Sequence, residues 1–468
     1  MAWGKTVGVA SWVERLKTND AGLISVTVFR GRLFGSDEAA AVCDALHTNT
    51  HLLELYASGH AMDAATAAKL TKALAANKTL QSLCVGDDCF GDEGLAALAP
   101  GVAKSASLRT LDLENKGIGD VGAAALGNAL ATAKDGGCPS LTTINISRND
   151  ALGPEGIAAV CTGAAHLQKL EKLVLNELNV GGVAADAIAA LLASAPALCA
   201  LDLTNAKLDV AAGDVGKLRK GFDTRAQRKD APPLSLEMDG VELGDAGAIA
   251  LAGETRGANV KRLSLRGCGV GCEGGRAVAR AALSAATETL ILSDNTLGDA
   301  GAHAVAQALG DATSTSTSLR TLDLGCCGVG ADGAAALAQN AADITDLSLF
   351  GNESIGNDGL AAIARAGSDT QFPGLRALKS LDVGGCGADE AGLIAFCDAL
   401  ARDEKNLQNL ETLVVGGNPG TQGDGWEPAL GRLRDARPTL DVAWRAADAG
   451  ESPETRENSA ALLAQAGE

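Results

Sequence analysis

The chain has 468 residues, of which 46% are hydrophobic, 21% are charged and only 3% are aromatic. The hydrophobic fraction excludes an intrinsically disordered chain, and the shortage of aromatic side chains excludes a core built from bulky residues, so we expect a thin, repetitive core of Leu, Val and Ala. Lys and Arg together number 39 and Asp and Glu number 58, a formal net charge of −19, which argues against nucleic acid or an anionic membrane as the main partner.

The first 22 residues precede the repetitive part of the chain. They contain no apolar core of signal-peptide length, and they include Trp3 and Trp12. Because the terminal unit of a stacked array exposes an edge of the core, which bulky side chains cover well, we interpret residues 1–22 as an N-terminal cap.

From Leu23 onward, the pattern L-x-x-L-x-L recurs fourteen times at intervals of 25 to 34 residues. Its clearest copies begin at Leu108, Leu198 and Leu319. Alternating apolar positions over so short a run predict a strand with one buried face. The first positions of the fourteen copies are Leu23, Leu52, Leu80, Leu108, Leu141, Leu170, Leu198, Ala231, Val260, Thr287, Leu319, Ile344, Leu378 and Leu410.

Eight repeats carry a G-x-x-G pair soon after the strand, usually with Asp, Asn or Glu between the glycines. This pattern predicts a turn that needs a permissive backbone, followed by an acidic helix start. Runs rich in Ala and Leu, such as 122–130 and 301–309, then predict helices that lie close to their neighbours. The glycine pairs are Gly91/Gly94, Gly119/Gly122, Gly153/Gly156, Gly244/Gly247, Gly271/Gly274, Gly298/Gly301, Gly330/Gly333 and Gly356/Gly359.

A single strand–turn–helix unit of this length cannot bury its own apolar face, but a stack of such units builds one continuous core. The sequence therefore predicts an α/β solenoid of about 14 repeats, with parallel strands on one surface and helices on the other. A helix is wider than a strand, so we expect the stack to curve into a horseshoe with the strands on the concave face and the helices on the convex face.

The segment 108–130 resembles leucine-rich repeats of the ribonuclease-inhibitor type, and the resemblance covers about residues 23–415. It implies the horseshoe fold, and it implies Asn or Cys at the third position after the last strand Leu. That position holds Asn149, Cys268, Asn295, Cys327, Asn352, Cys386 and Asn418. It departs from the pattern at Asp88, Lys116, Leu178, Ala206 and Asp239, where we expect looser turns.

Beyond the repeats, residues 419–445 contain Trp426 and Trp444 and are interpreted as a C-terminal cap, which leaves 23–418 as the leucine-rich repeat array. Residues 446–468 are polar and are expected to form a mobile tail. Within the array, the segment 217–229 carries six basic residues and one acid. A solvated outer face, a nuclear-import address and a contact for an acidic partner are all compatible with it.

The motif G-x-G-x-x-G occurs at 117–122, 269–274 and 328–333, each time between a predicted strand and a predicted helix. A dinucleotide phosphate loop has this context. However, the motif recurs in phase with the repeat, whereas a nucleotide site needs a single such loop. We therefore interpret all three copies as structural turns and expect no cofactor.

Clusters of metal ligands or catalytic groups are not evident in the sequence. Cys268 and Cys272 belong to a repeat two away from Cys326 and Cys327, roughly 10 Å along a sheet, so these thiols should not converge on one zinc ion. We expect no metal site, no catalytic residue and no enzymatic activity of the chain's own. Twelve scattered cysteines indicate reduced thiols, hence the cytoplasm or the nucleus. The longest apolar window, 187–201, is too short to span a bilayer.

The middle residue of L-x-L points away from the core, so these positions and the next one along form two columns on the concave face. Asp recurs in the first column, which predicts an acidic stripe for a basic partner, with aromatic residues as apolar anchors. The alternative is that Asp merely suits a solvated face. The candidate partner-binding residues are Phe29, Tyr56, Asp112, Glu114, Asp202, Glu237, Asp323, Phe350 and Asp382.

These observations favour a non-enzymatic scaffold that binds a protein partner with a basic patch through its concave surface. The repeats are also similar to those of the Ran GTPase-activating protein, which implies an alternative function as a GTPase activator with a small GTPase as partner. That family often ends in a dense acidic run, whereas residues 445–468 mix acids with Arg445 and Arg456, and no catalytic residue can be carried over. The partner's identity and the oligomeric state stay open.

Overall fold

The computed structural model describes residues 9–32, 34–132, 138–253, 259–285, 287–311, 318–368, 374–403, 406–423 and 425–444. Trp3 and the predicted tail 446–468 lie outside these ranges. The chain forms two compact units, which are described separately. The first unit comprises Met1–Val241 with Gly257–Asn259, and the second comprises Glu242–Arg256 with Val260–Glu468.

The first unit alternates helices and strands throughout its described residues. Its strands are β1 (Ser25–Thr27), β2 (Glu54–Ser58), β3 (Ser82–Gly86), β4 (Thr110–Asp112), β5 (Thr143–Asn145), β6 (Lys172–Val174), β7 (Ala200–Asp202) and β8 (Leu234–Glu237). Its helices are α1 (Val9–Lys17), α2 (Ser36–Leu46), α3 (Ala64–Ala76), α4 (Gly91–Lys104), α5 (Asp120–Thr132), α6 (Pro154–Ala164), α7 (Val183–Ser194) and α8 (Asp214–Ala226).

The second unit continues the same alternation. Its strands are β9 (Val260–Ser264), β10 (Thr289–Ile291), β11 (Thr321–Asp323), β12 (Asp346–Ser348), β13 (Ser380–Asp382), β14 (Thr412–Val414) and β15 (Asp441–Ala443). Its α-helices are α9 (Gly244–Ala252), α10 (Cys272–Ser284), α11 (Gly298–Asp311), α12 (Ala331–Asn340), α13 (Gly356–Ser368), α14 (Glu390–Arg402) and α15 (Glu427–Ala436). Two short 3₁₀ helices, η2 (Glu353–Ile355) and η3 (Pro419–Gln422), precede α13 and α15.

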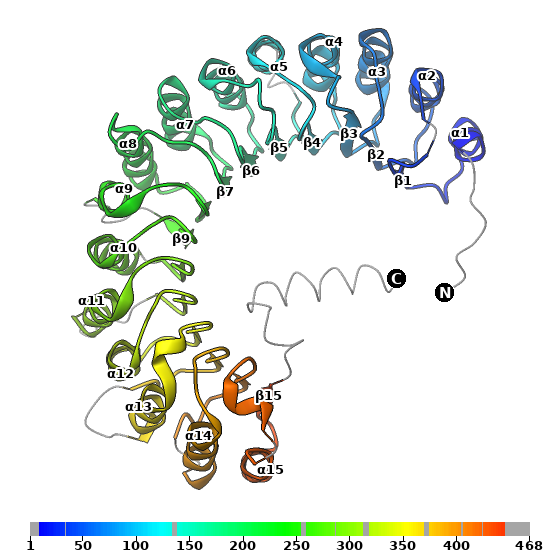
Figure 1. The fold of residues 1–468 in the computed structure, drawn as a ribbon. Helices are drawn as coiled ribbons and strands as arrows, with labels where there is room; N and C mark the ends of the chain where they lie inside the picture. Colours follow the sequence, from blue (N-terminus) through cyan, green and yellow to red (C-terminus); the bar gives the residue numbers. More distant parts are fainter. Residues whose placement is uncertain are drawn as a thin grey trace. The chain divides into compact units, whose positions relative to one another are not determined.

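Within each unit, consecutive strands pair in parallel and follow chain order. In each unit the strands lie side by side on one face and the helices cover the opposite face (Figure 1). The predicted α/β solenoid with parallel strands is therefore confirmed. The described residues contain fifteen strands, one more than the predicted number of repeats, because β15 lies in the segment interpreted as the C-terminal cap.

The core of each repeat is made by the three apolar positions of the strand pattern. In the repeat of β4, Leu108, Leu111 and Leu113 are fully buried. Burying one such side chain contributes about 1.5–3 kcal/mol, so the contribution per repeat is modest and stability depends on stacking.

Asn side chains close the turns after the strands, as the Asn/Cys pattern predicts. Asn149 Nδ2 donates to the carbonyls of Leu113 (2.9 Å) and Ile146 (2.8 Å), while its Oδ1 accepts from the Ile118 amide (3.0 Å). At the equivalent place, Cys327 Sγ donates to the Leu292 carbonyl at 3.0 Å. These buried side chains therefore bind backbone groups of their own and the preceding repeat.

In four of the glycine pairs, the acidic residue reaches the next repeat. Asp120 Oδ1 accepts from the amides of Gly153 (2.8 Å) and Gly156 (2.9 Å), so it caps the start of α6. A Cβ added to Gly156 would lie 2.6 Å from that oxygen, which explains the glycine. The same pattern joins Asp92, Asp245 and Asp299 to the glycine pairs that follow them.

This inter-repeat cap also settles the role of the three G-x-G-x-x-G copies. In each of them, the amides of the last two glycines bind the carboxylate of the preceding repeat, at Asp92, Asp245 or Asp299. A phosphate would need those same amides. The three copies are structural turns, as predicted.

Candidate functional site

The two columns predicted on the strand face are largely confirmed by the strand register. In the first unit the register joins Thr27 to Tyr56 and continues strand by strand to Asp202. One correction is needed in β8. The copy of the pattern that begins at Ala231 puts Ser235 at the middle position of L-x-L, but Asp202 pairs with Glu237. Leu234, Leu236 and Met238 are all buried. The apolar residues of this strand can therefore be aligned with the L-x-L pattern in two ways that differ by two residues. In the observed register, Met238 occupies the position of the last Leu of the pattern.

The column is more exposed in the first unit than in the second, although Cys84 and Val174 of the first unit are buried. Side chains that are exposed or half-buried in the first unit are Thr27, Tyr56, Asp112, Asn145, Asp202 and Glu237. In the second unit, Asp323 is half-buried, whereas the other predicted members of the column are buried. The buried members are Ser264, Ile291, Ser348, Asp382 and Val414. Polar groups on the strand face are therefore accessible mainly in the first unit.

Asp382 does not lie on an open surface, contrary to the prediction. It is 4% exposed, and its Oδ1 accepts from the Gly384 amide at 2.8 Å. A Cβ placed on Gly384 would lie near both this oxygen and the ring of Phe350. The carboxylate thus closes a local turn beside Phe350, which is itself half-buried.

Two carboxylates of the first unit are bound only by neutral donors among the described residues. Asp112 Oδ1 accepts from the Glu114 amide (3.0 Å) and Asn145 Nδ2 (3.2 Å). Asp202 accepts from Thr204 Oγ1 (2.8 Å) and from Asn176 Nδ2 (3.3 Å). Both are half-buried, so each presents a negative charge without a cation beside it.

Glu114 is in a different situation. Its Oε1 lies 3.2 Å from the Arg148 guanidinium, which also binds Glu177 at 2.8 Å. Hydrogen bonding to Glu177 raises the pKa of Arg148 above its usual value. Arg148 therefore neutralises part of the acidic stripe on the strand face.

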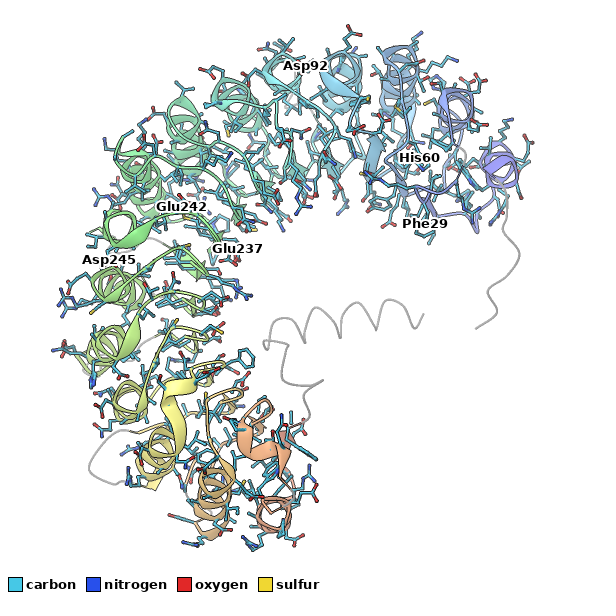
Figure 2. All side chains as sticks on the ribbon, in the orientation of Figure 1. Phe29, His60, Asp92, Glu237, Glu242 and Asp245 are labelled. Carbon is cyan, nitrogen blue, oxygen red and sulfur yellow. The ribbon has the colours of Figure 1, made fainter. Side chains whose placement is uncertain are left out.

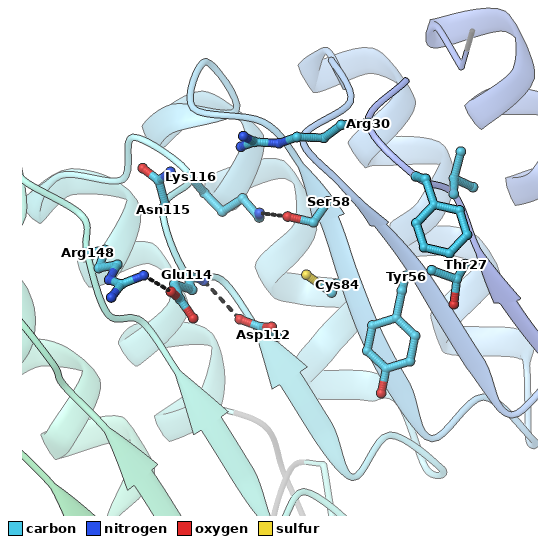
Figure 3. A pocket seen from close by; sticks show the side chains of 12 residues that line it. Thr27, Arg30, Tyr56, Ser58, Cys84, Asp112, Glu114, Asn115, Lys116 and Arg148 are labelled. Carbon is cyan, nitrogen blue, oxygen red and sulfur yellow. Dashed lines mark hydrogen bonds and ion pairs between the residues drawn. The ribbon is translucent and has the colours of Figure 1, made fainter. Parts of the chain in front are cut away.

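A pocket of about 600 Å³ lies at the N-terminal end of this face and brings together four of the predicted residues (Figure 3). They are Phe29, Tyr56, Asp112 and Glu114. Phe29 is 68% exposed and lies on the strand side of the unit, whereas Asp92 lies on the helix side (Figure 2). The pocket is the part of the strand face where predicted anchors and predicted acids meet.

The same pocket contains three cationic residues that sequence reasoning missed, Arg30, Lys116 and Arg148. Lys116 is 2% exposed, and its Nζ lies 2.6 Å from Ser58 Oγ at the end of β2 (Figure 3). The sequence signal was Lys116 at a position where the repeat pattern has Asn or Cys. We expected only a looser turn there, but the long side chain crosses the width of β3 instead.

The remaining predicted residues lie elsewhere. Asp202 and Glu237 occupy paired positions on β7 and β8 of the first unit. Asp323 and Phe350 lie on and just after strands of the second unit. Figure 2 shows Glu237 on the strand side of its unit.

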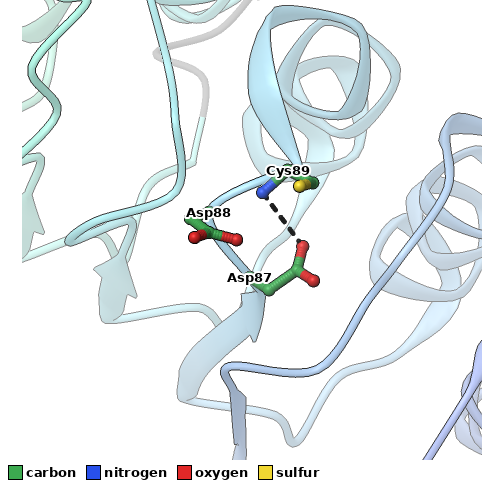
Figure 4. Close-up of side chains that lie close together, drawn as sticks. All are labelled: Asp87, Asp88 and Cys89. Atoms are coloured by element: carbon green, nitrogen blue, oxygen red, sulfur yellow. Dashed lines mark hydrogen bonds between the residues drawn. The ribbon is translucent and has the colours of Figure 1, made fainter.

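An exposed loop after β3 gathers Asp87, Asp88 and Cys89 (Figure 4). Asp87 Oδ1 accepts from the Cys89 amide at 3.1 Å, which forms a local turn. The negative charges of Asp88 and Asp87 raise the pKa of the Cys89 thiol. Three consecutive residues in such a turn are explained by local geometry and do not by themselves make a metal site.

The basic segment 217–229 forms most of α8, and three of its cations bind within the first unit. Lys217 pairs with Asp214 at 3.1 Å, and Arg228 donates to the carbonyls of Ala193 and Ala195. Arg225 is 2% exposed. A fully solvated basic face is therefore excluded for these residues.

All twelve cysteines are free thiols. None of the described helices is both long and apolar enough to cross a bilayer.

Comparison with known proteins supports the repeat assignment. A sequence model of the family described as Leucine Rich repeat matches residues 104–127, 137–161, 288–306, 315–338 and 342–364, each of which contains one strand and the start of the next helix. No curated protein matches the sequence. The ribonuclease-inhibitor type and the likeness to the Ran GTPase activator stay predictions.

Two solved structures are similar at low identity. The crystal structure of the Rad7 and Elc1 complex in yeast shares 15% identity, with a TM-score of 0.42 over 94% of both chains. The tropomodulin C-terminal domain of Caenorhabditis elegans shares 18% identity, with a TM-score of 0.28 over 34% of this chain and 92% of that one.

Proposed function

Because the chain is a leucine-rich repeat protein, we propose that it is a protein-binding scaffold that engages a partner with a basic patch through the strand face of its first unit. The coarser part of this statement, a protein-binding scaffold, follows from the repeats. The choice of the first unit follows from its exposed column, since the equivalent column of the second unit is mostly buried.

The proposal that the partner is basic depends on two carboxylates, Asp112 and Asp202. Their described donors are neutral, and both side chains stay half-exposed on a rigid sheet. A Lys or Arg of a partner would meet them without first breaking an ion pair, and the net charge of −19 would accelerate its approach. The twelve free thiols suit a reducing compartment, so we also propose a cytoplasmic or nuclear location.

We expect Asp202→Lys to weaken binding of the partner by about tenfold and to reduce the salt dependence of the affinity, because an attractive contact becomes repulsive. Proteins captured from native lysate at low and high salt supply the candidates, and each purified candidate is then titrated against both forms of the chain. Asp44→Lys is the matched control, since Asp44 is exposed on α2 and gives the same change of charge.

A direct partner that binds wild type and Asp202→Lys equally well at low salt would contradict the proposal. A partner that is weakened as much by Asp44→Lys would show that net charge, rather than the strand face, governs binding. No observation on the described residues favours GTPase activation, so we propose no second function.

A further inference from the structure

Two cations in the pocket of Figure 3 lack an anionic partner among the described residues. Arg30 is exposed, and its stem lies against Gly59, where an added Cβ would clash with it. Lys116 reaches the neighbouring Ser58 from a loop two repeats away. Both cations therefore flank the dipeptide Ser58–Gly59, and we call this part of the cavity the Arg30–Lys116 pocket.

Of the two cations, Lys116 has the greater need for an anionic partner, because its ammonium is buried. Its side chain is withdrawn from solvent, and among the described residues its Nζ binds one neutral hydroxyl, although an ammonium carries three donors. Burial of a charge is costly unless the charge is paired and hydrogen-bonded. An anionic oxygen entering the pocket would supply both the missing charge and the missing acceptor.

The acids of the pocket do not fill that role. Asp112 and Glu114 lie on the opposite side of the cavity, where Asn145 and Arg148 bind them. Arg148 is shared by Glu114 and by Glu177, so it supplies no spare positive charge, whereas Arg30 and Lys116 have no carboxylate partner among the described residues. Positive charge is thus left over at the Ser58 side.

The rest of the lining is aromatic. Phe29 is one of the few large apolar side chains exposed in the described residues. Tyr56 on β2 is half-exposed, pairs in register with Thr27, and lines the same pocket as Phe29. A free ion would leave these rings uncovered, whereas a peptide would place an apolar side chain on them. The cavity volume of about 600 Å³ suits a few residues of a peptide.

We propose that the Arg30–Lys116 pocket binds an acidic side chain of a partner's peptide segment, with the carboxylate between Arg30 and Lys116 and an adjacent apolar side chain on Phe29 and Tyr56. This inference rests on protein binding by the first unit, but it gives the Arg30–Lys116 side of the cavity the opposite charge preference from Asp112, on the other side of the same cavity, and from Asp202. A partner segment would then be acidic and apolar at this end and basic further along the sheet, which fixes its direction.

The test is calorimetric titration of the full chain with a capped hexapeptide of alternating Leu and Glu. An equally long peptide of alternating Leu and Gln has the same shape without the charge. We expect measurable binding of the Glu peptide and at least about tenfold weaker binding of the Gln peptide, because a charge-assisted hydrogen bond is lost. Arg30→Gln should weaken the Glu peptide by a similar factor, and Lys116→Met should do so as well.

Arg219→Gln is the matched control, because Arg219 lies on α8 away from the pocket, and it should leave binding of the Glu peptide unchanged. If Lys116→Met fails to fold, Arg30→Gln still decides, because Arg30 is exposed. Equal affinity for the two peptides, or unchanged binding in Arg30→Gln, would overturn the proposal. If inorganic phosphate at an equal concentration displaces the Glu peptide, the pocket binds a free anion and the proposed peptide occupant is wrong.

The outcomes are separable from those of the proposed function. Asp202→Lys leaves the pocket intact and should keep the Glu peptide bound, while Arg30→Gln should keep a basic partner bound. A partner that Asp202→Lys does not weaken overturns only the proposed function, and a Glu peptide that Arg30→Gln does not weaken overturns only the pocket.

Discussion

Arg225 illustrates how a residue that looks like surface charge in the sequence can belong to the interior. Its guanidinium donates to the carbonyls of Leu192, Leu198 and Pro232. Burial lowers the pKa of Arg225 below its usual value, but the acceptors are carbonyls at the end of α7 and in the two loops beside α8, which suit a cation. The basic run 217–229 therefore joins two repeats.

Arg225→Ala should lower the free energy of unfolding by about 3 kcal/mol, because it removes a buried cation and leaves its carbonyl acceptors without that donor. Arg219→Ala, on the same helix, should change it by less than about 0.5 kcal/mol. Urea unfolding followed by far-ultraviolet circular dichroism measures both. Equal effects of the two substitutions would mean that the guanidinium does not hold the repeats together.

Between elements, the carboxylate cap joins the starts of α5, α6, α10 and α12 to the repeat before each of them. Asp120 is the first residue of α5 but satisfies the amides at the start of α6. The glycines leave room for that carboxylate, so the acid and the next glycine pair form one unit split across two repeats. This explains why the acidic residue and the glycines recur together along the sequence.

Asp120→Ala should destabilise the chain by about 1–2 kcal/mol, the usual effect of losing an N-cap. The loss should appear at the start of α6 rather than in α5, where the residue itself lies. Hydrogen exchange of the Gly153 and Gly156 amides locates it, with Asp120→Asn as a milder variant that keeps an acceptor oxygen. Faster exchange confined to α5 would contradict the inter-repeat cap.

At the scale of elements, the sequence predicts well those features that repeat with a fixed period. Strand positions, the register of most of the column and the Asn/Cys turns follow from spacing alone. Prediction from the repeat period fails where a residue differs from the type that the repeat pattern has at that position. Met238 in place of Leu hides a shift of two residues, and Lys116 in place of Asn or Cys reaches another repeat. A contact across two repeats has no counterpart in a local pattern, so the cationic side of the pocket could not be predicted.

For the whole molecule, the division into two compact units predicts that unfolding is not a single cooperative transition. Contacts in a repeat array are between neighbours, so separate units can lose structure separately. Burial raises the pKa of Cys161 in the first unit and of Cys397 in the second to about 12. Because the thiolate is the reactive form, both should be inert at pH 8 in the folded chain.

We expect maleimide to label exposed Cys89 and Cys326 first, and to label Cys161 and Cys397 only above their own unfolding transitions in urea, at two different concentrations. Peptide mapping by mass spectrometry reports each site. Cys138, which is buried in the first unit, serves as the control and should follow Cys161. Labelling of all three buried thiols at one urea concentration would show a single cooperative transition instead.

The carboxylate cap has a direction, and that direction matches the order of synthesis. Asp92, Asp120, Asp245 and Asp299 each precede by 26 to 36 residues the amides that they bind. For these four caps, the acceptor has already emerged from the ribosome when its helix start appears, so the earlier repeat is a template for the next. The start of α7 is an exception, because the Gly182 amide binds Asp214 of the following repeat at 3.0 Å. A chain shortened from its C-terminus would keep each of the four caps whose helix remains, whereas one shortened from its N-terminus beyond Asp92 would leave the start of α5 without its carboxylate.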